Sequence, residues 1–160
     1  MATRVYLGLG SNLGDREANL LAAIEGLEPA VTVTAQSSIY QTEAWGVDDQ
    51  PDFLNMALAG MTALEPAALL HFVKRLEVAL GREPAERWGP RVIDIDILFF
   101  GNEEVDLPGL QVPHVGAHER ATVLVPLAEI APDLMHPGSG TTVASLVDGV
   151  DKSGVRPYHR

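Results

Sequence analysis

The sequence contains no cysteine, which excludes disulfide bonds and metal sites built from thiolates. It has no apolar run long enough to cross a membrane, and its first residues lack the basic-then-apolar pattern of a signal peptide. We therefore expect a cytoplasmic protein with no membrane partner. Positive charge is also scarce, with 11 Lys and Arg residues against 22 Asp and Glu and a net charge of -11. We expect no nucleic acid partner, because binding a polyanion requires an excess of cations.

The few cations are unevenly placed along the chain. None lies between residues 17 and 73, whereas five lie between residues 74 and 91. One interpretation is a solvated helix end followed by a charged loop. Another is a site for a phosphorylated ligand, because the planar guanidinium group of arginine makes paired hydrogen bonds to phosphate. At this point both interpretations remain.

The pattern of apolar residues predicts an α+β fold. A chain of 160 residues, 46% of them hydrophobic, suits a single domain over 1–160, in which residues 148–160 have the composition of a polar tail. Strands are predicted over 4–10, 31–40, 53–60 and 92–100, and helices over 15–28 and 65–80. This order is that of a ferredoxin-like βαββαβ core. A C-terminal extension follows it, with a short helix predicted near 124–130.

Two carboxylates interrupt the strand predicted over 92–100. Asp94 and Asp96 would share one face, with their α-carbons ~6.5 Å apart, because alternate side chains of a strand point the same way. The opposite face would point into the core and consists of Ile93, Ile95, Ile97 and Phe99. The two aspartates could lie in solvent on an amphipathic strand, or they could bind Mg²⁺ together with water and phosphate oxygens. We favour the metal site, because strands disfavour aspartate and arginines precede this pair.

Two other motifs do not support the function that they first suggest. The glycines at 8, 10 and 14 are spaced one residue too widely for a dinucleotide-binding fingerprint, and no G-K-[ST] sequence follows them. We interpret them as a tight turn between a strand and a helix. His114 and His118 are four residues apart but lack the H-E-x-x-H pattern, so a zinc site is not expected.

Several motifs together resemble the 6-hydroxymethyl-7,8-dihydropterin pyrophosphokinase family. They are GLGSNLGD (8–15), YQTEAWG (40–46), QPDFLN (50–55), LGREPAERWGPRVIDIDILFFG (80–101), VPHVGAHER (112–120) and PLAEIAPDLMHP (126–137). The combination of RWGPRVIDIDI and QPDFLN is highly specific for the family. The resemblance implies an Mg-dependent enzyme of folate biosynthesis. It would transfer pyrophosphate from ATP to the hydroxymethyl group of the pterin, releasing AMP.

The resemblance also implies roles for individual residues. Asp94 and Asp96 would hold two Mg²⁺ ions and, with Arg82 and Arg91, form the catalytic set. The implied ATP-binding residues are Glu77, Arg82, Trp88, Arg91, Ile97, Leu110, His114 and Arg120. The implied pterin-binding residues are Thr42, Trp45, Gly46, Phe53 and Asn55. ATP and the pterin would be the partners of a monomeric protein.

The sequence departs from the family pattern in three places. Ala44 stands where a proline is common, Thr122 stands where an aromatic ring usually covers the pterin, and the loop over 82–91 is one residue shorter than in some relatives. A competing interpretation is a non-catalytic ferredoxin-like module that senses a nucleotide or Mg²⁺. The joint presence of the aspartate pair, the arginines and a pterin-type pocket favours the enzyme.

Overall fold

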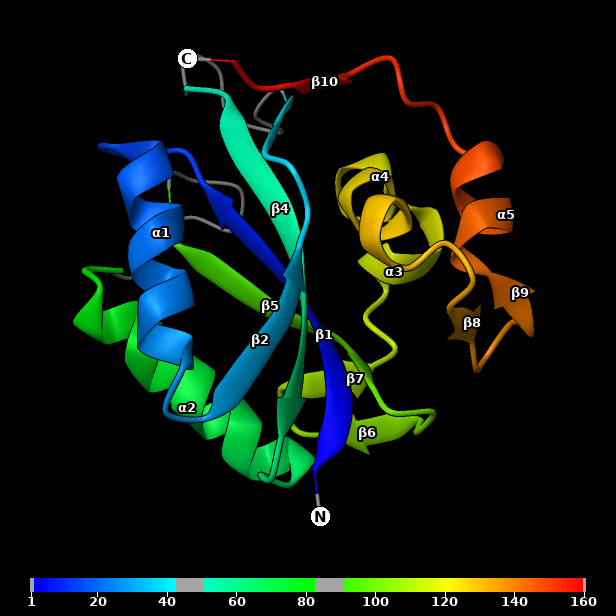
Figure 1. The fold of residues 1–160 in the computed structure, drawn as a ribbon, viewed down its shortest axis with the longest axis horizontal. Helices are drawn as coiled ribbons and strands as arrows, with labels where there is room; N and C mark the ends of the chain where they lie inside the picture. The colour runs from blue at the N-terminus through cyan, green and yellow to red at the C-terminus, as the bar shows by residue number, and fades with distance from the viewer. Residues whose placement is uncertain (1, 43–50, 83–90, 160) are drawn as a thin grey trace.

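An antiparallel sheet forms the centre of the protein (Figure 1). The computed structural model describes residues 2–42, 51–82 and 91–159. Within these ranges the sheet consists of β1 (Thr3–Ser11), β2 (Val31–Gln36), β3 (Tyr40–Thr42), β4 (Phe53–Thr62), β5 (Asp94–Phe100) and β10 (Val155–Pro157). The strands pair in the order β10-β3-β4-β1-β5, and β2 also pairs with β4. Each of these pairings is antiparallel.

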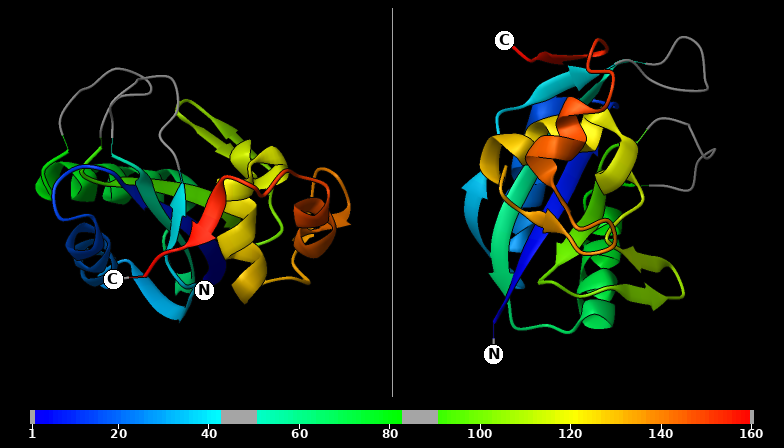
Figure 2. Two further views of the ribbon diagram at one scale, coloured as in Figure 1. Left: turned by 90° about the horizontal axis from the view of Figure 1, so that it is seen from above. Right: turned by 90° about the vertical axis from the view of Figure 1, so that its right-hand side faces the viewer.

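Helices cover both faces of this sheet and give the fold three layers (Figures 1 and 2). One face is covered by α1 (Arg16–Leu27) and α2 (Pro66–Ala79), and the other by α3 (Gly116–Glu119), α4 (Ala121–Ile130) and α5 (Val143–Asp148). A hairpin of β6 (Val105–Leu107) and β7 (Leu110–Val112) lies beside α2 (Figure 2). A second hairpin joins β8 (Met135–His136) and β9 (Thr141–Thr142). No described helix combines the length and apolar character that a membrane span requires.

Each face of the sheet has its own apolar core. Under α1 and α2, Leu7 of β1 packs in one cluster with Leu20 and Val73. Under α4, Leu98 of β5 packs in a second cluster with Leu124. A fully buried leucine or valine contributes about 1.5–3 kcal/mol relative to an exposed one. Burial on both faces therefore holds β1 and β5 firmly in the middle of the molecule.

Local sequence signals set the ends of the two long helices. The Asp15 carboxylate accepts a hydrogen bond of 3.1 Å from Ala18 N, as expected of an N-cap. Pro66 occupies the first turn of α2, where its missing N–H costs nothing. The helix is followed by Gly81, whose φ of 106° lies in the region that only glycine enters easily. The helices predicted from the apolar periodicity are confirmed to within a residue at each end.

The single strand predicted over 31–40 is wrong, because the structure has two strands there, β2 and β3. The break falls at two serines. Ser37 Oγ accepts a hydrogen bond of 2.8 Å from Ala57 N and donates one of 2.7 Å to Ser38 O. A serine hydroxyl that bonds nearby backbone groups competes with the regular ladder, which explains the interruption.

The face predicted for Phe99 is also wrong. Phe99 lies with Leu98 in the core under α4, whereas Phe100 lies in the core under α1 and α2. The pairing of β1 with β5 skips one residue, Leu98, so β5 carries a β-bulge. The extra residue reverses the alternation of the side chains that follow it. Asp94 and Asp96 precede the bulge and keep the face predicted for them.

The polar segment over 148–160 takes part in the sheet. Its strand β10 pairs with the edge strand β3. Arg156 makes a salt bridge of 2.9 Å to Asp52, and Tyr158 packs against the core under α1 and α2. His159 is exposed. The salt bridge joins residues 104 positions apart, so no local periodicity in the sequence could indicate it.

Candidate active site

A row of paired residues crosses β4, β1 and β5 on the face that carries the aspartates. Gly10 pairs with Asn55 on one side and with Asp94 on the other, and Gly8 pairs with Asp96. Directly paired residues of an antiparallel sheet project from the same face. The two glycines therefore place no side chain between the Asn55 amide and the carboxylates. The result is an open floor bordered by polar groups.

This arrangement corrects the interpretation of Gly8 and Gly10 as part of a turn. Both lie inside β1, and of the three glycines only Gly14, with a φ of 74°, is in the turn that follows. A β-carbon on Gly10 would lie 3.0 Å from Asn55 Oδ1 and 3.6 Å from the Phe53 ring. Glycine within a strand often marks a place where a ligand approaches the backbone. The alternation G-x-G within an otherwise apolar strand is the sequence pattern that indicates such an approach of a ligand.

The two carboxylates have different partners. Asp94 Oδ1 accepts a hydrogen bond of 3.0 Å from Arg82, and Asp96 Oδ1 lies 3.8 Å from His114 Nε2. Each aspartate side chain is a little over one third exposed. Burial, followed by the negative charge of Asp94, raises the pKa of Asp96 to about 7. The pair therefore resists holding two negative charges unless a cation offsets them.

A buried carboxylate on α2 fixes the arginine beside this pair. Glu77 is 2% exposed, and its Oε2 accepts 2.7 Å hydrogen bonds from both Arg82 and Ile95 N. Its Oε1 lies 3.3 Å from Lys74 Nζ. Glu77 thus ties α2 to β5 and orients the Arg82 guanidinium between two carboxylates.

His114 is held in one orientation by its own turn. Its Nδ1 accepts a hydrogen bond of 2.9 Å from Gly116 N, so the neutral ring carries its proton on Nε2, the atom that faces Asp96. Burial, and then the positive charge of Arg120, lower the pKa of His114. A neutral ring with an Nε2–H group near the aspartates can donate a hydrogen bond to an anionic ligand.

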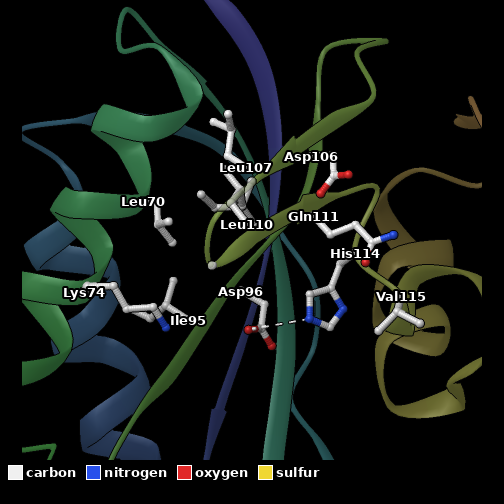
Figure 3. A pocket seen from close by; sticks show the side chains of 12 residues that line it. Leu70, Lys74, Ile95, Asp96, Asp106, Leu107, Leu110, Gln111, His114 and Val115 are labelled. Carbon is white, nitrogen blue, oxygen red and sulfur yellow. Dashed lines mark ion pairs between the residues drawn. The ribbon is translucent and has the colours of Figure 1, made fainter.

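Two cavities adjoin Asp96, and the larger of them lies between α2, β5 and the β6–β7 hairpin (Figure 3). Its volume of about 400 Å³ is within the range of small-molecule sites. Apolar side chains form one part of its lining, namely Leu70, Ile95, Ile97, Leu107, Leu110 and Val115. Polar side chains form the rest, and in Figure 3 the Asp96 carboxylate lies between Lys74 and His114. The cavity thus has an apolar portion and a charged end.

A smaller cavity lies on the other side of the aspartates, over the glycine floor. It is lined by Gly8, Gly10, Phe53, Asn55, Asp94, Asp96, Thr122 and five apolar neighbours. The Asn55 amide is oriented by Thr42, whose Oγ1 accepts a hydrogen bond of 2.9 Å from Asn55 Nδ2. Asp96 is thus part of the lining of both cavities. A group that bridges the two would pass the aspartate pair.

Comparison with known proteins identifies the family. Residues 6–132 match the sequence profile described as 7,8-dihydro-6-hydroxymethylpterin-pyrophosphokinase (HPPK). The chain is 50% identical to the 2-amino-4-hydroxy-6-hydroxymethyldihydropteridine pyrophosphokinase of Methylorubrum extorquens, over 96% of this chain and 97% of that protein. It is also 50% identical to the Bacillus subtilis enzyme of the same name, over 96% and 94% of the two chains. The chain belongs to the HPPK family.

Solved structures share the fold. A crystal structure of wild-type Plasmodium falciparum HPPK-DHPS with pteroate superposes with a TM-score of 0.73 at 16% identity. The match covers 92% of this chain and 42% of that longer chain. At this identity the likeness concerns the fold alone. It agrees with the mixed helices and antiparallel sheet described above.

Membership of the HPPK family confirms the predicted activity, and the chain is a pyrophosphokinase of folate biosynthesis. The alternative of a non-catalytic sensor module is set aside, because the match to these enzymes covers nearly the whole chain. The match concerns the chain as a whole and assigns no role to any single residue of the site.

The structure brings most of the residues implied by the resemblance around the two cavities. Ile97, Leu110 and His114 line the larger one, whereas Glu77 lies behind it. Arg120 follows α3 and acts on the His114 ring through its charge. Arg91 hydrogen-bonds through its backbone to Asn12. Four positions, Ala44, Trp45, Gly46 and Trp88, lie outside the described residues, as do residues 83–90 of the shortened loop.

Sequence reasoning missed several residues of the larger cavity. Lys74, Asp106 and Gln111 line it, yet Lys74 was considered only as one of the cations over 74–91 and the other two were given no role. Lys74 is one turn before Glu77 on α2, and residues at that spacing lie side by side on a helix. The sequence could therefore have placed Lys74 beside Glu77. Asp106 and Gln111 face each other across the β6–β7 hairpin, where the resemblance implied a role for Leu110 alone.

The described residues hold no group of three or more His, Asp or Glu side chains arranged for a metal ion. Asp94 and Asp96 supply two carboxylates only. That number suits Mg²⁺, which commonly takes one or two protein carboxylates and completes its octahedron with water and substrate phosphates. The raised pKa of Asp96 is what an unneutralised carboxylate pair should show. The donor set therefore fits the ion.

Proposed function

We propose that Asp94 and Asp96 hold two Mg²⁺ ions between bound ATP and the bound pterin. The observation that carries the proposal is that Asp96 lines both cavities, with Asp94 beside it in the smaller one. A pyrophosphoryl group that moved from a nucleotide in the larger cavity to an acceptor in the smaller one would pass both carboxylates. When bound, the ions would neutralise the charge of the phosphates and help to align them.

We assign the larger cavity to ATP, the expected co-substrate of an HPPK enzyme. Its apolar walls from α2 and the β6–β7 hairpin, including Leu70 and Leu110, offer dispersion contacts to a flat purine ring. Lys74, His114 and Asp96 lie together at its charged end. This polarity supports an orientation in which the base lies among the aliphatic side chains and the phosphates point to the aspartate pair.

The hydrogen-bond donors around this end would bind the phosphates. Arg82 is held by Glu77 at 2.7 Å and already reaches the metal pair, so it can move from Asp94 to a phosphate oxygen with little rearrangement. His114 would donate from Nε2. We assign the same task to Arg91 and Arg120, on the resemblance. The proposed role of Trp88 as a neighbour of the nucleotide rests on the resemblance alone.

We assign the smaller cavity to the pterin. Phe53 offers an aromatic face, and Asn55 offers an amide whose oxygen can accept and whose nitrogen can donate hydrogen bonds to a heterocycle edge. Thr42 would act by orienting Asn55. Trp45 and Gly46 stay predictions of the same site. The open floor over Gly8 and Gly10 leaves room for the hydroxymethyl group near Asp94 and Asp96.

The reaction needs no nucleophile from the protein. The pterin hydroxyl oxygen attacks the β-phosphorus of ATP and its proton passes to solvent, the bond from that phosphorus to the bridging oxygen of AMP breaks, and AMP leaves. The protein contributes by holding both substrates in line and by offsetting the charge on the transferred group. Phe53 and Asn55 of the smaller cavity suit the first task, and Lys74 of the larger one, with Arg82 beside the aspartate pair, suits the second.

We further propose that the fold is ferredoxin-like at its core, supported by the order in which β1, β4 and β5 pair. In this view β2 and β3 together take the place of one strand. A single domain over 1–160, a monomeric state and a cytoplasmic location stay predictions from the sequence. Limited proteolysis would test the single domain, and size-exclusion chromatography with light scattering the monomeric state.

The assay that tests the proposal is AMP release from ATP, with and without hydroxymethyl-dihydropterin, over a series of Mg²⁺ concentrations. We expect AMP release only with the pterin present, and none after chelation by EDTA. Asp94→Asn and Asp96→Asn should nearly abolish it at any Mg²⁺ concentration. Asp106→Asn is the matched control, since it removes a carboxylate from the larger cavity without touching the pair. Equal losses in all three variants would contradict the metal assignment.

A further inference from the structure

Glu129 of α4 forms a cluster of hydrogen bonds with the segment around the start of β3. Its two carboxylate oxygens share the Ser38 N–H, at 2.9 and 3.1 Å, and its Oε2 also accepts a bond of 3.1 Å from Ser38 Oγ. Its Oε1 accepts a bond of 2.7 Å from the Tyr40 hydroxyl. These two partners lie 91 and 89 positions away in the sequence. Ser38 falls in the break between β2 and β3, which leaves its N–H available to the helix.

The Tyr40 hydroxyl is a dependable donor to this carboxylate. Burial, followed by the hydrogen bond to Glu129 and the negative charge of Glu129, raises the pKa of Tyr40 to about 12. The phenol therefore keeps its proton at neutral pH. Hydrogen bonds to an ionised acceptor are roughly twice as strong as those between neutral groups. Glu129 thus ties α4 to the Ser38–Tyr40 segment more firmly than a neutral side chain would.

The two elements that Glu129 joins both shape the smaller cavity. On α4, Thr122 lines that cavity. It precedes Glu129 by seven residues, which is about two helical turns, so both side chains lie on the same side of the helix. On β3, Thr42 follows Tyr40 by two residues and shares its face. Thr42 accepts the 2.9 Å hydrogen bond that orients the Asn55 amide in the cavity.

Apolar packing holds α4 against β4 but does not fix its distance from β3. Leu124 and Leu127 lie in one core cluster with Ala57 of β4, which α4 covers (Figure 1). Among the residues that the structure describes, this cluster includes none from β3. Apolar burial has no preferred direction, whereas a hydrogen bond requires a defined distance and angle. The bonds of Glu129 therefore set the separation of α4 from β3.

We propose that Glu129 is a positioning residue for the pterin, which fixes the width of the smaller cavity by holding α4 at a set distance from β3. Without the carboxylate, α4 keeps its apolar contacts with β4 but is free to shift relative to β3. Thr122 on the helix and Asn55 on the sheet would then lose the spacing that a ring between them needs. The inference rests on the proposed assignment of the smaller cavity to the pterin.

Calorimetry with an α,β-methylene analogue of ATP plus Mg²⁺ tests the proposal, because that analogue cannot release AMP. Glu129→Ala should raise the pterin Kd about five- to tenfold, since a gap of even half an ångström forfeits about a quarter of a dispersion contact. The affinity for the analogue, which occupies the other cavity, should not change. Glu129→Gln keeps one acceptor oxygen and Tyr40→Phe keeps the bonds to Ser38, so both should give smaller increases in the pterin Kd.

Steady-state AMP release gives a second measure. The KM for the pterin should rise in Glu129→Ala while kcat stays close to that of the wild type, because the aspartate pair and the groups around the phosphates are unchanged. Thr142→Ala is the matched control for stability. It removes the 3.2 Å N-cap bond to Ser145 N of α5, a helix that packs against α4 but lines neither cavity. It should lower the melting temperature and leave the pterin Kd unchanged.

The outcomes separate this inference from the function on which it rests. A wild-type protein that binds no pterin, or a folded Phe53→Ala variant that binds it as tightly as the wild type, would overturn the assignment of the cavity. A folded Glu129→Ala variant with the wild-type pterin Kd would overturn the inference alone. It would also be overturned if Thr142→Ala weakened pterin binding as much, or if Glu129→Ala weakened binding of the analogue equally. If Glu129→Ala does not fold, Glu129→Gln and Tyr40→Phe decide by the same criteria.

Discussion

Replacing Glu77 should damage both the stability of the fold and the active site. In Glu77→Ala, the buried Ile95 N–H loses its acceptor and Arg82 loses its shorter salt bridge, each of 2.7 Å in the wild type. Hydrogen bonds to charged groups contribute about 1.5–3 kcal/mol each, and breaking a buried ion pair costs about 3–5 kcal/mol. We therefore expect the free energy of unfolding to fall by about 3–5 kcal/mol. That loss is a large part of an ordinary domain's total of about 5–15 kcal/mol.

The isosteric variant Glu77→Gln separates the two effects. Its amide oxygen can still accept from Ile95 N, so the loss of stability should be nearer 1 kcal/mol, the difference between a charge-assisted and a neutral hydrogen bond. Arg82 would nevertheless lose its anchoring charge and bind Asp94 more closely, which competes with the metal. We expect turnover to fall at least about tenfold in Glu77→Gln, which corresponds to about 1.4 kcal/mol of transition-state stabilisation.

Urea unfolding and steady-state AMP release measure the two quantities. Lys74→Ala is the control for stability, because it removes only the 3.3 Å contact of a side chain that is 53% exposed. Exposed ion pairs contribute about 0–1 kcal/mol, so this variant should unfold much like the wild type. The reasoning would be refuted if Glu77→Ala lost no more stability than Lys74→Ala, or if Glu77→Gln kept full turnover.

The local part of the site could be predicted from the sequence. The alternation of a strand has a period of two whatever surrounds it, so Asp94 and Asp96 had to share a face opposite Ile93 and Ile95. The burial of Glu77 could also be predicted from the sequence, because Glu77 follows Val73 by four residues on the apolar stripe of α2. A carboxylate on such a stripe needs a partner, and a cation five residues later at Arg82 could supply it.

The non-local part could not be predicted. The β-bulge at Leu98 depends on how β5 meets β1, and its sequence has no glycine or proline to mark it. The pairing of β10 with β3 and the bonds from Asn12 to Pro51 and Arg91 join segments far apart in the chain. Such contacts arise only when the whole sheet has assembled. Family resemblance could suggest which residues bind, whereas the hydrogen bonds that orient them required coordinates.

Three further predictions concern the two cavities. Asp94→Ala should nearly abolish turnover yet leave the melting temperature unchanged or higher, because it relieves repulsion and exposes no apolar surface; near-normal turnover would contradict the metal role. Thr122→Phe should tighten pterin binding about two- to twelvefold in calorimetry, since an added ring over the smaller cavity is worth roughly 0.5–1.5 kcal/mol; weaker or unchanged binding would mean that residue 122 does not face the pterin. The last prediction is a pH dependence of the metal-free protein. The pKa of Asp96 is raised from 3.8 in the unfolded chain to about 7 in the folded one, so the folded state binds the extra proton. The stability that this proton provides should be fully present below pH 3.8 and lost as the pH rises through about 7. Asp96→Asn lacks this titration, so in EDTA the melting temperature of the wild type minus that of the variant should decrease from pH 5 to about pH 7 and level off above it, where folded Asp96 no longer holds the extra proton. Saturating Mg²⁺ should abolish the decrease, because the bound cation takes the place of the proton. A difference that stays constant across this range in EDTA would show that Asp96 is already ionised without a cation, and that the pair does not need one.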